Sequence, residues 1–328
     1  MIERLPLYKL HIPILPMNYT LGLTYKCNSR CKTCRVYERE PVEEMLPTEW
    51  LRIFKQLGKS PYWITFTGGE PFLYKDLPEV YYDLTETCNP KLINIPTNGL
   101  LTERIVDWVW QMTKASPHTK LTVNVSIDAL SSLNDEIRGI SGAYDRAVET
   151  VKKLQELHLD NLDVGVHTVI STFNIADFTH IQHELSALVR PGLYITEIAE
   201  LRNELANRDI EITPRPDQYL CVFDSIKTSN TWKGILRSRY YYMTAKWLYT
   251  HQQEFPCYAG YASCQITPNG DVWFCCTLAI SIGNLREKDF RTIWQGKEAT
   301  NLRKDTKCTC PLANASYTNM ILSPWRLF

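Results

Sequence analysis

The 328-residue chain carries 36 Lys and Arg residues against 36 Asp and Glu residues, so no overall positive field attracts nucleic acid or an anionic membrane. Hydrophobic residues make up 44% of the chain, which excludes a mainly disordered protein and favours one large α/β domain, alone or with a small second one. No apolar run is long enough to cross a membrane, and Glu3, Arg4 and Lys9 interrupt the opening segment, so we expect a cytoplasmic protein without a signal peptide.

The first two thirds of the chain alternate between short β-rich runs and amphipathic helical segments at intervals of about thirty residues, which is the spacing of βα units. Apolar residues recur at helical spacing between the runs, and Pro47 and Gly58 mark the start and end of one helix. Six units are too few for a closed eight-stranded barrel, so we predict an α/β fold with a partial (β/α)6, TIM-like barrel. The six predicted strands are Tyr19–Thr24, Tyr62–Thr67, Lys91–Thr97, Leu121–Ile127, Leu162–Ile170 and Leu193–Ile198.

The pattern changes after Ile198. The following residues are polar and interrupted by proline, and two aromatic-rich helical stretches come next, near Tyr219–Lys227 and Tyr240–His251. From Cys257 onward, the run CQITPNGDVWFCC has the alternation and turn residues of a β-hairpin, and a helix is expected around Asp289–Arg303. We therefore predict a barrel domain at residues 15–200, a helical linker at residues 201–256 and a small Cys-rich domain at residues 257–328.

The 11 cysteines are unusual for a cytoplasmic chain, because thiols there stay reduced and rarely form structural disulfides. Only Cys88 and Cys221 stand alone, and we expect both to be buried as small hydrophobic residues. The other nine form two clusters and predict two metal sites. These are Cys27, Cys31 and Cys34 near the start, and Cys257, Cys264, Cys275, Cys276, Cys308 and Cys310 in the last quarter.

The first cluster has the spacing CxxxCxxC and directly follows the first predicted strand. Three thiolates on one short loop can hold three irons of a 4Fe–4S cube and leave the fourth iron open. A zinc site more often uses paired CxxC motifs. The alternatives are a zinc corner that a distant histidine completes, or a chance arrangement.

This motif resembles the hallmark of radical S-adenosylmethionine (SAM) enzymes, and later positions agree with it. The segment Gly68-Gly69-Glu70-Pro71 resembles the GGEP motif of that family, Thr97-Asn98-Gly99 its TNG turn, and Asn134-Asp135-Glu136-Ile137-Arg138-Gly139 its HDxxRG segment. Thr33 stands where the family often has an aromatic residue, and Asn134 where it often has histidine. The resemblance implies a 4Fe–4S cluster that binds SAM and an electron donor such as flavodoxin or ferredoxin.

The resemblance also implies which residues contact SAM. The Gly68–Glu70 turn would meet the amino group of its methionine, and glycine there would let the ligand approach the strand closely. Ser126 and Arg138 would hold its carboxylate, since a guanidinium matches a carboxylate well. The full expected SAM set is Gly68, Gly69, Glu70, Thr97, Asn98, Ser126, Asp128, Arg138 and Thr168.

The second cysteine cluster resembles the SPASM/twitch extension of the same family, which carries auxiliary 4Fe–4S clusters. Six cysteines are too few for two fully Cys-ligated cubes, so we expect one auxiliary cluster. A zinc ribbon is the alternative. The preferred ligands are Cys257, Cys275, Cys308 and Cys310, with Cys264 and Cys276 as substitutes.

Polar residues near the end of the fifth and sixth predicted strands are candidates for contact with substrate. Glu197 and Glu200 fall where the open mouth of such a barrel binds its substrate. His167 either faces the interior or is a satisfied core histidine. The candidate catalytic residues are Glu197 and two possible hydrogen donors, Cys276 and Cys221.

The resemblance predicts a radical SAM enzyme that forms a 5′-deoxyadenosyl radical and abstracts hydrogen from a small polar, sugar-like metabolite, leading to dehydrogenation or epimerisation. Only 26 residues precede Cys27, too few for the folded peptide-binding segment that many peptide maturases carry there. The alternative is a SPASM-type maturase that crosslinks or oxidises a precursor peptide. A third possibility is a non-catalytic iron–sulfur or zinc protein. No nucleic-acid or membrane partner is expected.

Overall fold

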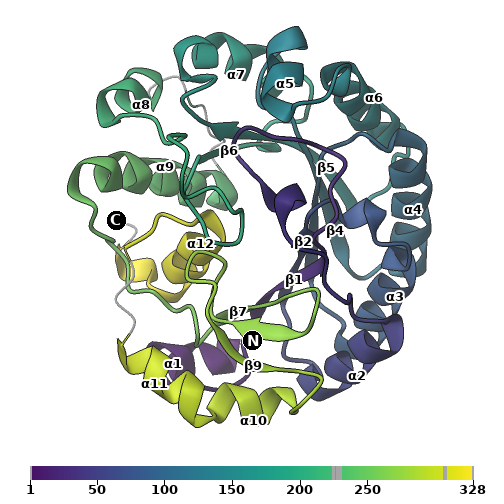
Figure 1. Ribbon diagram of the computed structural model, residues 1–328, viewed down its shortest axis with the longest axis vertical. Helices are drawn as coiled ribbons and strands as arrows, with labels where there is room; N and C mark the ends of the chain where they lie inside the picture. The colour runs from purple at the N-terminus through teal and green to yellow at the C-terminus, as the bar shows by residue number, and fades with distance from the viewer. Residues whose placement is uncertain (1, 224–225, 227–230, 306–308, 327–328) are drawn as a thin grey trace.

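The computed structural model describes residues 2–223, 226, 231–305 and 309–326, and its centre is one curved nine-stranded sheet. The strand order is β6-β5-β4-β3-β2-β1-β7-β8-β9. The strands from β6 across to β7 run parallel to one another, whereas β8 is antiparallel to its neighbours β7 and β9. Helices lie around the outside of the sheet (Figure 1). The first six strands are β1 Asn18–Thr24, β2 Trp63–Gly68, β3 Leu92–Thr97, β4 Lys120–Ser126, β5 Leu162–Ile170 and β6 Tyr194–Ile198, and each begins and ends within one residue of its predicted bounds.

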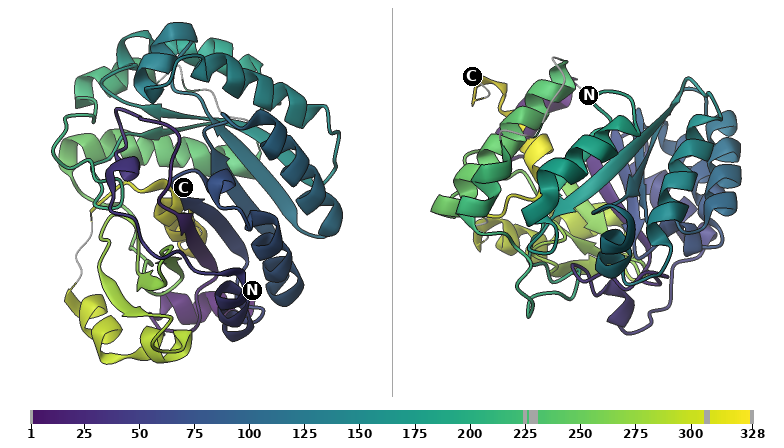
Figure 2. Two further views of the ribbon diagram at one scale, coloured as in Figure 1. Left: turned by 45° about the vertical axis from the view of Figure 1, so that its right-hand side comes forward. Right: turned by 90° about the horizontal axis from the view of Figure 1, so that it is seen from above.

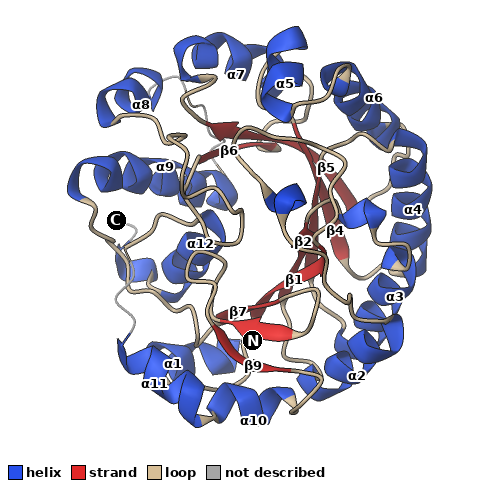
Figure 3. Ribbon diagram, in the orientation of Figure 1, coloured by secondary structure: helices blue, strands red, loops and turns tan. Residues whose placement is uncertain are grey.

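Helices cover the convex face of the sheet, as Figures 2 and 3 show, and the side chains between helices and sheet are apolar. Side chains such as Phe66 and Ile93 from the strands pack with Trp50, Phe54 and Tyr81 from the helices, all fully buried. The parallel order and the helix after each strand confirm the predicted partial barrel. The helices after β1 to β5 are α2 Pro47–Leu57, α3 Leu77–Cys88, α4 Thr102–Ala115, α5 Ser131–Arg138, α6 Ala143–Gln155 and α7 Phe178–Ala187, of which both α5 and α6 follow β4.

The concave face of the sheet is polar. Paired residues on neighbouring parallel strands lie on the same face of a sheet, so Ser126 shares this face with His167. Glu197 lies on it too, because its partner Val169 is two residues from His167 on β5. The curved sheet and its helices form an open ring, and farther from the strand ends in this ring the Asn124 side chain donates a hydrogen bond of 2.7 Å to that of Asn94. The sheet therefore separates an apolar core from a polar interior, and its strands end at loops around that interior.

The C-terminal quarter completes the sheet. The predicted hairpin is present as β7 Ser263–Ile266 and β8 Asp271–Trp273, followed by β9 Ser281–Asn284. The sequence did not predict that β7 joins β1 in parallel register, from Asn18 opposite Ser263 onward. The helix α12 Ala313–Leu322 lies inside the ring in Figure 1, where Asn314 donates to the Thr20 hydroxyl at 2.9 Å.

The remaining helices differ from prediction in their bounds. Of the linker helices, α8 covers Pro216–Phe223, and α9 covers Trp232–Thr250, beginning well before Tyr240 because Thr231 caps it by accepting from Gly234 N. The single helix expected near Asp289–Arg303 is two, α10 Phe290–Gln295 and α11 Lys297–Asp305, because Gly296 has an extended backbone. A short α1, Leu5–Lys9, precedes the sheet. Among the residues described, no helix is both long and apolar enough to cross a membrane.

Candidate active site at the carboxyl edge of the sheet

The loop that carries Cys27, Cys31 and Cys34 lies between β1 and a 3-10 turn, Val36–Glu38. Backbone hydrogen bonds hold it to the end of α5, since Arg30 N donates to the Arg138 carbonyl at 2.9 Å and Lys32 N to the Ile137 carbonyl at 2.8 Å. A further bond joins Glu70 N to the Lys26 carbonyl at 2.9 Å. The cysteine loop is thus fixed from the β2 end on one side and from α5 on the other.

The three thiols lie in a partly buried environment with N–H donors nearby. The side-chain amide of Asn98 is 4.0 Å from Cys27 Sγ, and Ser29 N is 3.5 Å from the same sulfur. Burial raises the pKa of Cys27 to about 11 and that of Cys34 to about 12. Without a metal these two thiols stay protonated at neutral pH, and metal binding would release their protons.

The Gly68–Glu70 turn follows β2 and packs directly on the cysteine loop. A Cβ on Gly68 would lie 2.0 Å from the Thr24 carbonyl oxygen, and one on Gly69 would lie 2.1 Å from the Lys26 carbonyl oxygen. These contacts would force the backbone apart. The glycines are therefore required by the neighbouring β1 segment, whereas we had expected the approach of a ligand to require them.

The carboxylate of Glu70 is buried beneath this turn. It accepts hydrogen bonds from the Thr97 hydroxyl at 2.8 Å, Asn98 N at 2.7 Å and Phe72 N at 3.2 Å. Burial raises the pKa of Glu70 to about 7, although the three donors act in the opposite direction. Glu70 thus joins the ends of β2 and β3, and holds Asn98 beside Cys27.

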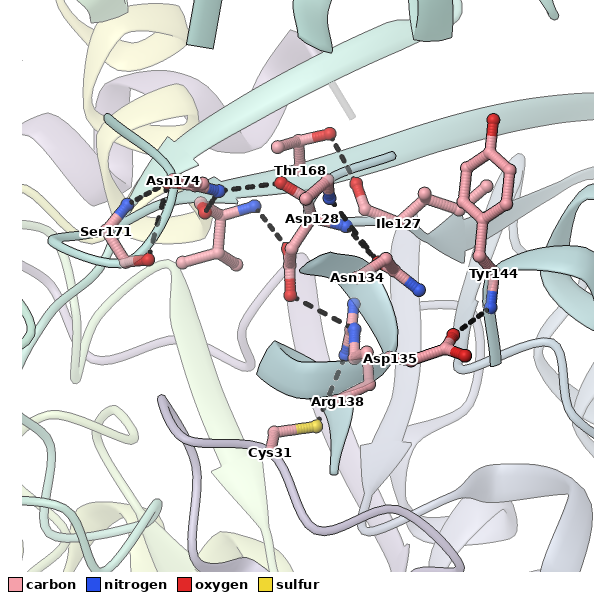
Figure 4. Close-up of polar contacts among 12 residues, drawn as sticks. Cys31, Ile127, Asp128, Asn134, Asp135, Arg138, Tyr144, Thr168, Ser171 and Asn174 are labelled. Atoms are coloured by element: carbon pink, nitrogen blue, oxygen red, sulfur yellow. Dashed lines mark hydrogen bonds and ion pairs between the residues drawn. The ribbon is translucent and has the colours of Figure 1, made fainter. Parts of the chain in front are cut away.

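Arg138 and Asp128 form a buried ion pair on the other side of the cysteine loop (Figure 4). Arg138 Nε lies 3.0 Å from Asp128 Oδ2, and Arg138 Nη1 lies 3.5 Å from Cys31 Sγ. Burial lowers the pKa of Arg138, but the Asp128 carboxylate and Cys31 outweigh it and hold the pKa above its usual range. A charged guanidinium is therefore fixed next to the second thiol.

Asp128 is itself held from three elements (Figure 4). Its carboxylate accepts from Val169 N of β5 at 2.9 Å, its backbone N–H donates to the Asn134 side chain of α5 at 2.9 Å, and its carbonyl accepts from the Asn174 side chain at 2.7 Å. Asn134 thus orders the turn before α5. With so many contacts, Asp128 is placed to orient Arg138.

The two other residues of the expected SAM set have different surroundings. Ser126 is partly exposed on the concave face, beside His167. Thr168 is fully buried, and its hydroxyl donates to the Ile127 carbonyl at 2.6 Å. The Thr168 hydroxyl is therefore engaged in joining β4 to β5.

Charged side chains gather where β6 ends, and Arg202 is a member that the sequence did not single out. Arg202 Nη2 lies 3.4 Å from Glu200 Oε1 and 3.8 Å from Glu197 Oε2, while His167 Nε2 lies 3.5 Å from Glu197 Oε1. Burial would raise the pKa of Glu197, but His167 and Arg202 hold it below its usual value, whereas burial raises the pKa of Glu200. Both candidate glutamates thus lie at the barrel mouth, with an arginine shared between them.

Residues 199–209 were predicted to belong largely to the linker but lie against the site. The Asn207 side chain donates to the carbonyls of Thr33 and Glu200, and Arg35 N donates to the Leu205 carbonyl. Nothing in the polar run ELRNELANRD distinguishes such a contact from an exposed linker.

Three of the C-terminal cysteines lie close together in the structure. Cys276 packs with Leu312 in a small cluster to which partly buried Cys275 and Cys310 also belong. Next to Cys257, Tyr258 N donates to the Asn319 side chain of α12 at 2.9 Å. Cys308 lies outside the described residues. Cys264, one of the two substitute ligands, is buried in the main core.

The two isolated cysteines differ in exposure. Cys88 is buried at the end of α3, as expected. Cys221 was expected to be buried too, and that prediction is wrong. It is exposed on α8, because Tyr219 and Val222 form the buried face of that helix.

The donor set fits iron–sulfur chemistry by its residue types. Thiols, N–H donors directed at sulfur and a nearby guanidinium surround the first cysteine loop. Within the described part of the chain, no three His, Cys, Asp or Glu side chains are already gathered in the geometry of a metal site. In a 4Fe–4S cube each thiolate binds a different iron, so the three sulfurs need not meet at one point, and ligation would replace the thiol protons by metal–sulfur bonds.

Comparison with known proteins gives two family matches. The Radical SAM superfamily matches residues 21–185, and the SPASM iron–sulfur cluster-binding domain matches residues 257–311. The matches begin close to the start of β1 and at Cys257, the first of the C-terminal cysteines.

Individual relatives were found in sequence and in structure. The sporulation killing factor maturation protein SkfB of Bacillus subtilis is 30% identical over 51% of this chain and 39% of its own length, and the PqqA peptide cyclase of Granulibacter bethesdensis is 25% identical over 87% and 75%. The chain spans less than half the length of the first curated relatives it matches. Streptococcus suis SuiB, solved with its precursor peptide SuiA, shares the fold with a TM-score of 0.65 at 18% identity, covering 94% of this chain and 73% of that one.

Proposed function

The chain belongs to the radical SAM superfamily and carries a SPASM iron–sulfur cluster-binding domain, and from this premise we propose that it modifies a precursor peptide. The modification would be a crosslink or an oxidation that begins with hydrogen abstraction. This is the alternative that the sequence left open, and it replaces the small-metabolite reaction as the preferred function.

The likeness to PqqA peptide cyclase carries this proposal. It extends over 87% of the chain, so it includes most of both matched domains rather than the barrel alone. SkfB is also named as a maturation protein, although its similarity covers only about half of the chain. Both relatives therefore favour a peptide substrate.

The residues at the carboxyl edge have separate roles in this proposal. Cys27, Cys31 and Cys34 would hold the 4Fe–4S cluster, and Arg138, oriented by Asp128, would bind the carboxylate of SAM. When bound and reduced, the cluster supplies the electron that cleaves the sulfonium bond of SAM. Glu70 keeps the β2 and β3 ends together beside Cys27.

The C-terminal cysteines would hold an auxiliary cluster. Cys275 and Cys310 already lie together in one small cluster of side chains, and both belong to the preferred ligand set. An auxiliary cluster can accept an electron from a substrate radical, which an oxidation or crosslink requires. An external donor of the flavodoxin or ferredoxin type would reduce the first cluster.

A second candidate keeps the small polar metabolite as substrate. The polar concave face favours it, because Asn94, Asn124, Ser126, His167 and Glu197 offer hydrogen-bonding groups to a sugar-like molecule inside the ring. Dehydrogenation or epimerisation would be the outcome. The candidate hydrogen donors are Cys276, which is buried, and Cys221, which is exposed.

The test uses anaerobically purified protein with reconstituted iron and a strong reductant. We expect 5′-deoxyadenosine from SAM, and none from the Cys34→Ala variant. Short peptides encoded next to the protein's own coding sequence are then supplied and analysed by mass spectrometry. A loss of two hydrogens supports the peptide proposal, modification of a sugar-like metabolite alone supports the second candidate, and no 5′-deoxyadenosine under any condition refutes both.

A further inference from the structure

Residues 199–209, called here the bridging loop, hold the cysteine loop on both sides of Cys34. The Asn207 side-chain amide donates to the Thr33 carbonyl at 2.9 Å, and this carbonyl belongs to the peptide bond that enters Cys34. Arg35 N, in the peptide bond that leaves Cys34, donates to the Leu205 carbonyl at 2.8 Å. The backbone of Cys34 is therefore placed by the bridging loop.

Cys31 is placed by a different element. Its neighbours Arg30 and Lys32 donate backbone hydrogen bonds to the end of α5, and its sulfur lies beside Arg138 of the same helix. The separation of Cys31 and Cys34 consequently depends on how the bridging loop sits relative to α5. A change in either element alters the positions of two of the three thiols.

The same bridging loop reaches the barrel mouth and the C-terminal hairpin. Asn207 donates to the Glu200 carbonyl at 3.1 Å and accepts from Arg202 N at 2.8 Å. The Glu204 carboxylate accepts from the side-chain amide of Gln265 on β7. Asn207 is fully buried, and its amide connects Cys34 with the segment that carries Glu200 and Arg202.

We propose that Asn207 is a positioning residue that fixes Cys34 relative to Cys31 and ties this position to the barrel mouth. The Asn207 side chain contacts backbone groups rather than a cysteine sulfur, and it acts on Cys34 through the Thr33 carbonyl. The proposal depends on the function above only for the identity of the group that the three thiols hold. Its consequence is that the cluster environment and the affinity for SAM change together when the Asn207 amide is lost.

The variants for the test are Asn207→Ala, Asn207→Asp and a control, Asn203→Ala. The alanine removes all three hydrogen bonds, whereas the aspartate keeps the acceptor for Arg202 N and loses both donors. Asn203 is exposed on the same loop and donates only a 3.5 Å bond to the Leu278 carbonyl. Each reconstituted protein is assayed for iron per chain, for the electron paramagnetic resonance (EPR) spectrum of the reduced cluster with and without SAM, and for the KM for SAM.

We expect both Asn207 variants to bind iron but to show shifted g-values. Their KM for SAM should rise by about fivefold or more, which corresponds to the net contribution of about one hydrogen bond. The Asn203 variant should match the wild type. Unchanged spectra and KM in both Asn207 variants would overturn the proposal, as would an equal change in the control. If neither Asn207 variant folds or binds iron, Asn207 has a purely structural role and the proposal is also wrong. A wild type that makes no 5′-deoxyadenosine, while Asn207→Ala still shifts the EPR spectrum, would refute the proposed function but not the positioning role.

Discussion

Replacing Asp128 by asparagine isolates the charge that holds Arg138 in place. Asparagine keeps the volume and an oxygen for Val169 N, but it removes the negative charge 3.0 Å from Arg138 Nε. The two side chains are only 2% and 13% exposed, so the guanidinium would stay buried beside Cys31 without its partner. Breaking a buried pair from one side costs about 3–5 kcal/mol, and we expect the free energy of unfolding to fall by that amount.

The assay is urea unfolding of the metal-free protein at pH 7 with a thiol reductant, followed by circular dichroism. Asp128→Asn is compared with Arg138→Met and with the double variant, because their coupling separates the ion pair from other effects. The loss of unfolding free energy in the double variant should be smaller, by at least about 1.5 kcal/mol, than the sum of the losses in the two single variants. Glu136→Gln, which removes an exposed partner of Lys32 from the same helix, serves as the control and should change little. A loss below about 1 kcal/mol for Asp128→Asn, or strict additivity, would refute this account.

Three further results are expected. Burial raises the pKa of Glu70 from 4.5 to about 7, so between these pH values the folded metal-free chain binds a proton that the unfolded chain does not. Its free energy of unfolding should therefore fall as pH rises from about 4.5 to 7. Urea titrations at several pH values should show this dependence, and Glu70→Gln should flatten it. Gly69→Ala should prevent iron incorporation, because its Cβ would clash with the Lys26 carbonyl oxygen. The control Gly142→Ala has a positive φ to accommodate but open space for the Cβ, so it should keep the iron content and lose only about 1 kcal/mol of stability. Cys275→Ala should still form 5′-deoxyadenosine but no modified peptide, and full product formation by this variant would contradict its role as an auxiliary ligand.

The strands and the first cysteine loop were predictable because their signals are local. Short β-rich runs at the spacing of βα units predicted the six strands, and CxxxCxxC and GGEP are short motifs whose residues lie together in the chain. The contacts between these motifs were only partly predictable. Arg138 was expected to bind SAM, but its pairing with Asp128 depends on how α5 packs against β4 and β5.

The missed residues depend on contacts between distant segments. Arg202 and Asn207 belong to a polar run that looks like a linker, and only the fold brings Asn207 to Thr33. The exposure of Cys221 followed from which face of α8 is buried, and a single short helix gives too little periodicity to decide that. Side-chain roles set by long-range packing were thus beyond the sequence alone.

The pairing of β7 with β1 has a consequence for how the protein is made. About 245 residues separate Asn18 from its partner Ser263, and at about 5–20 residues per second β1 waits roughly 12–50 s on the ribosome for its neighbour. During that time one side of β1 is an unprotected edge, which can pair with other chains. Chaperone demand and yield during expression should therefore depend on the last quarter of the chain, and a fragment that ends before β7 should aggregate even though it contains the whole first cysteine loop.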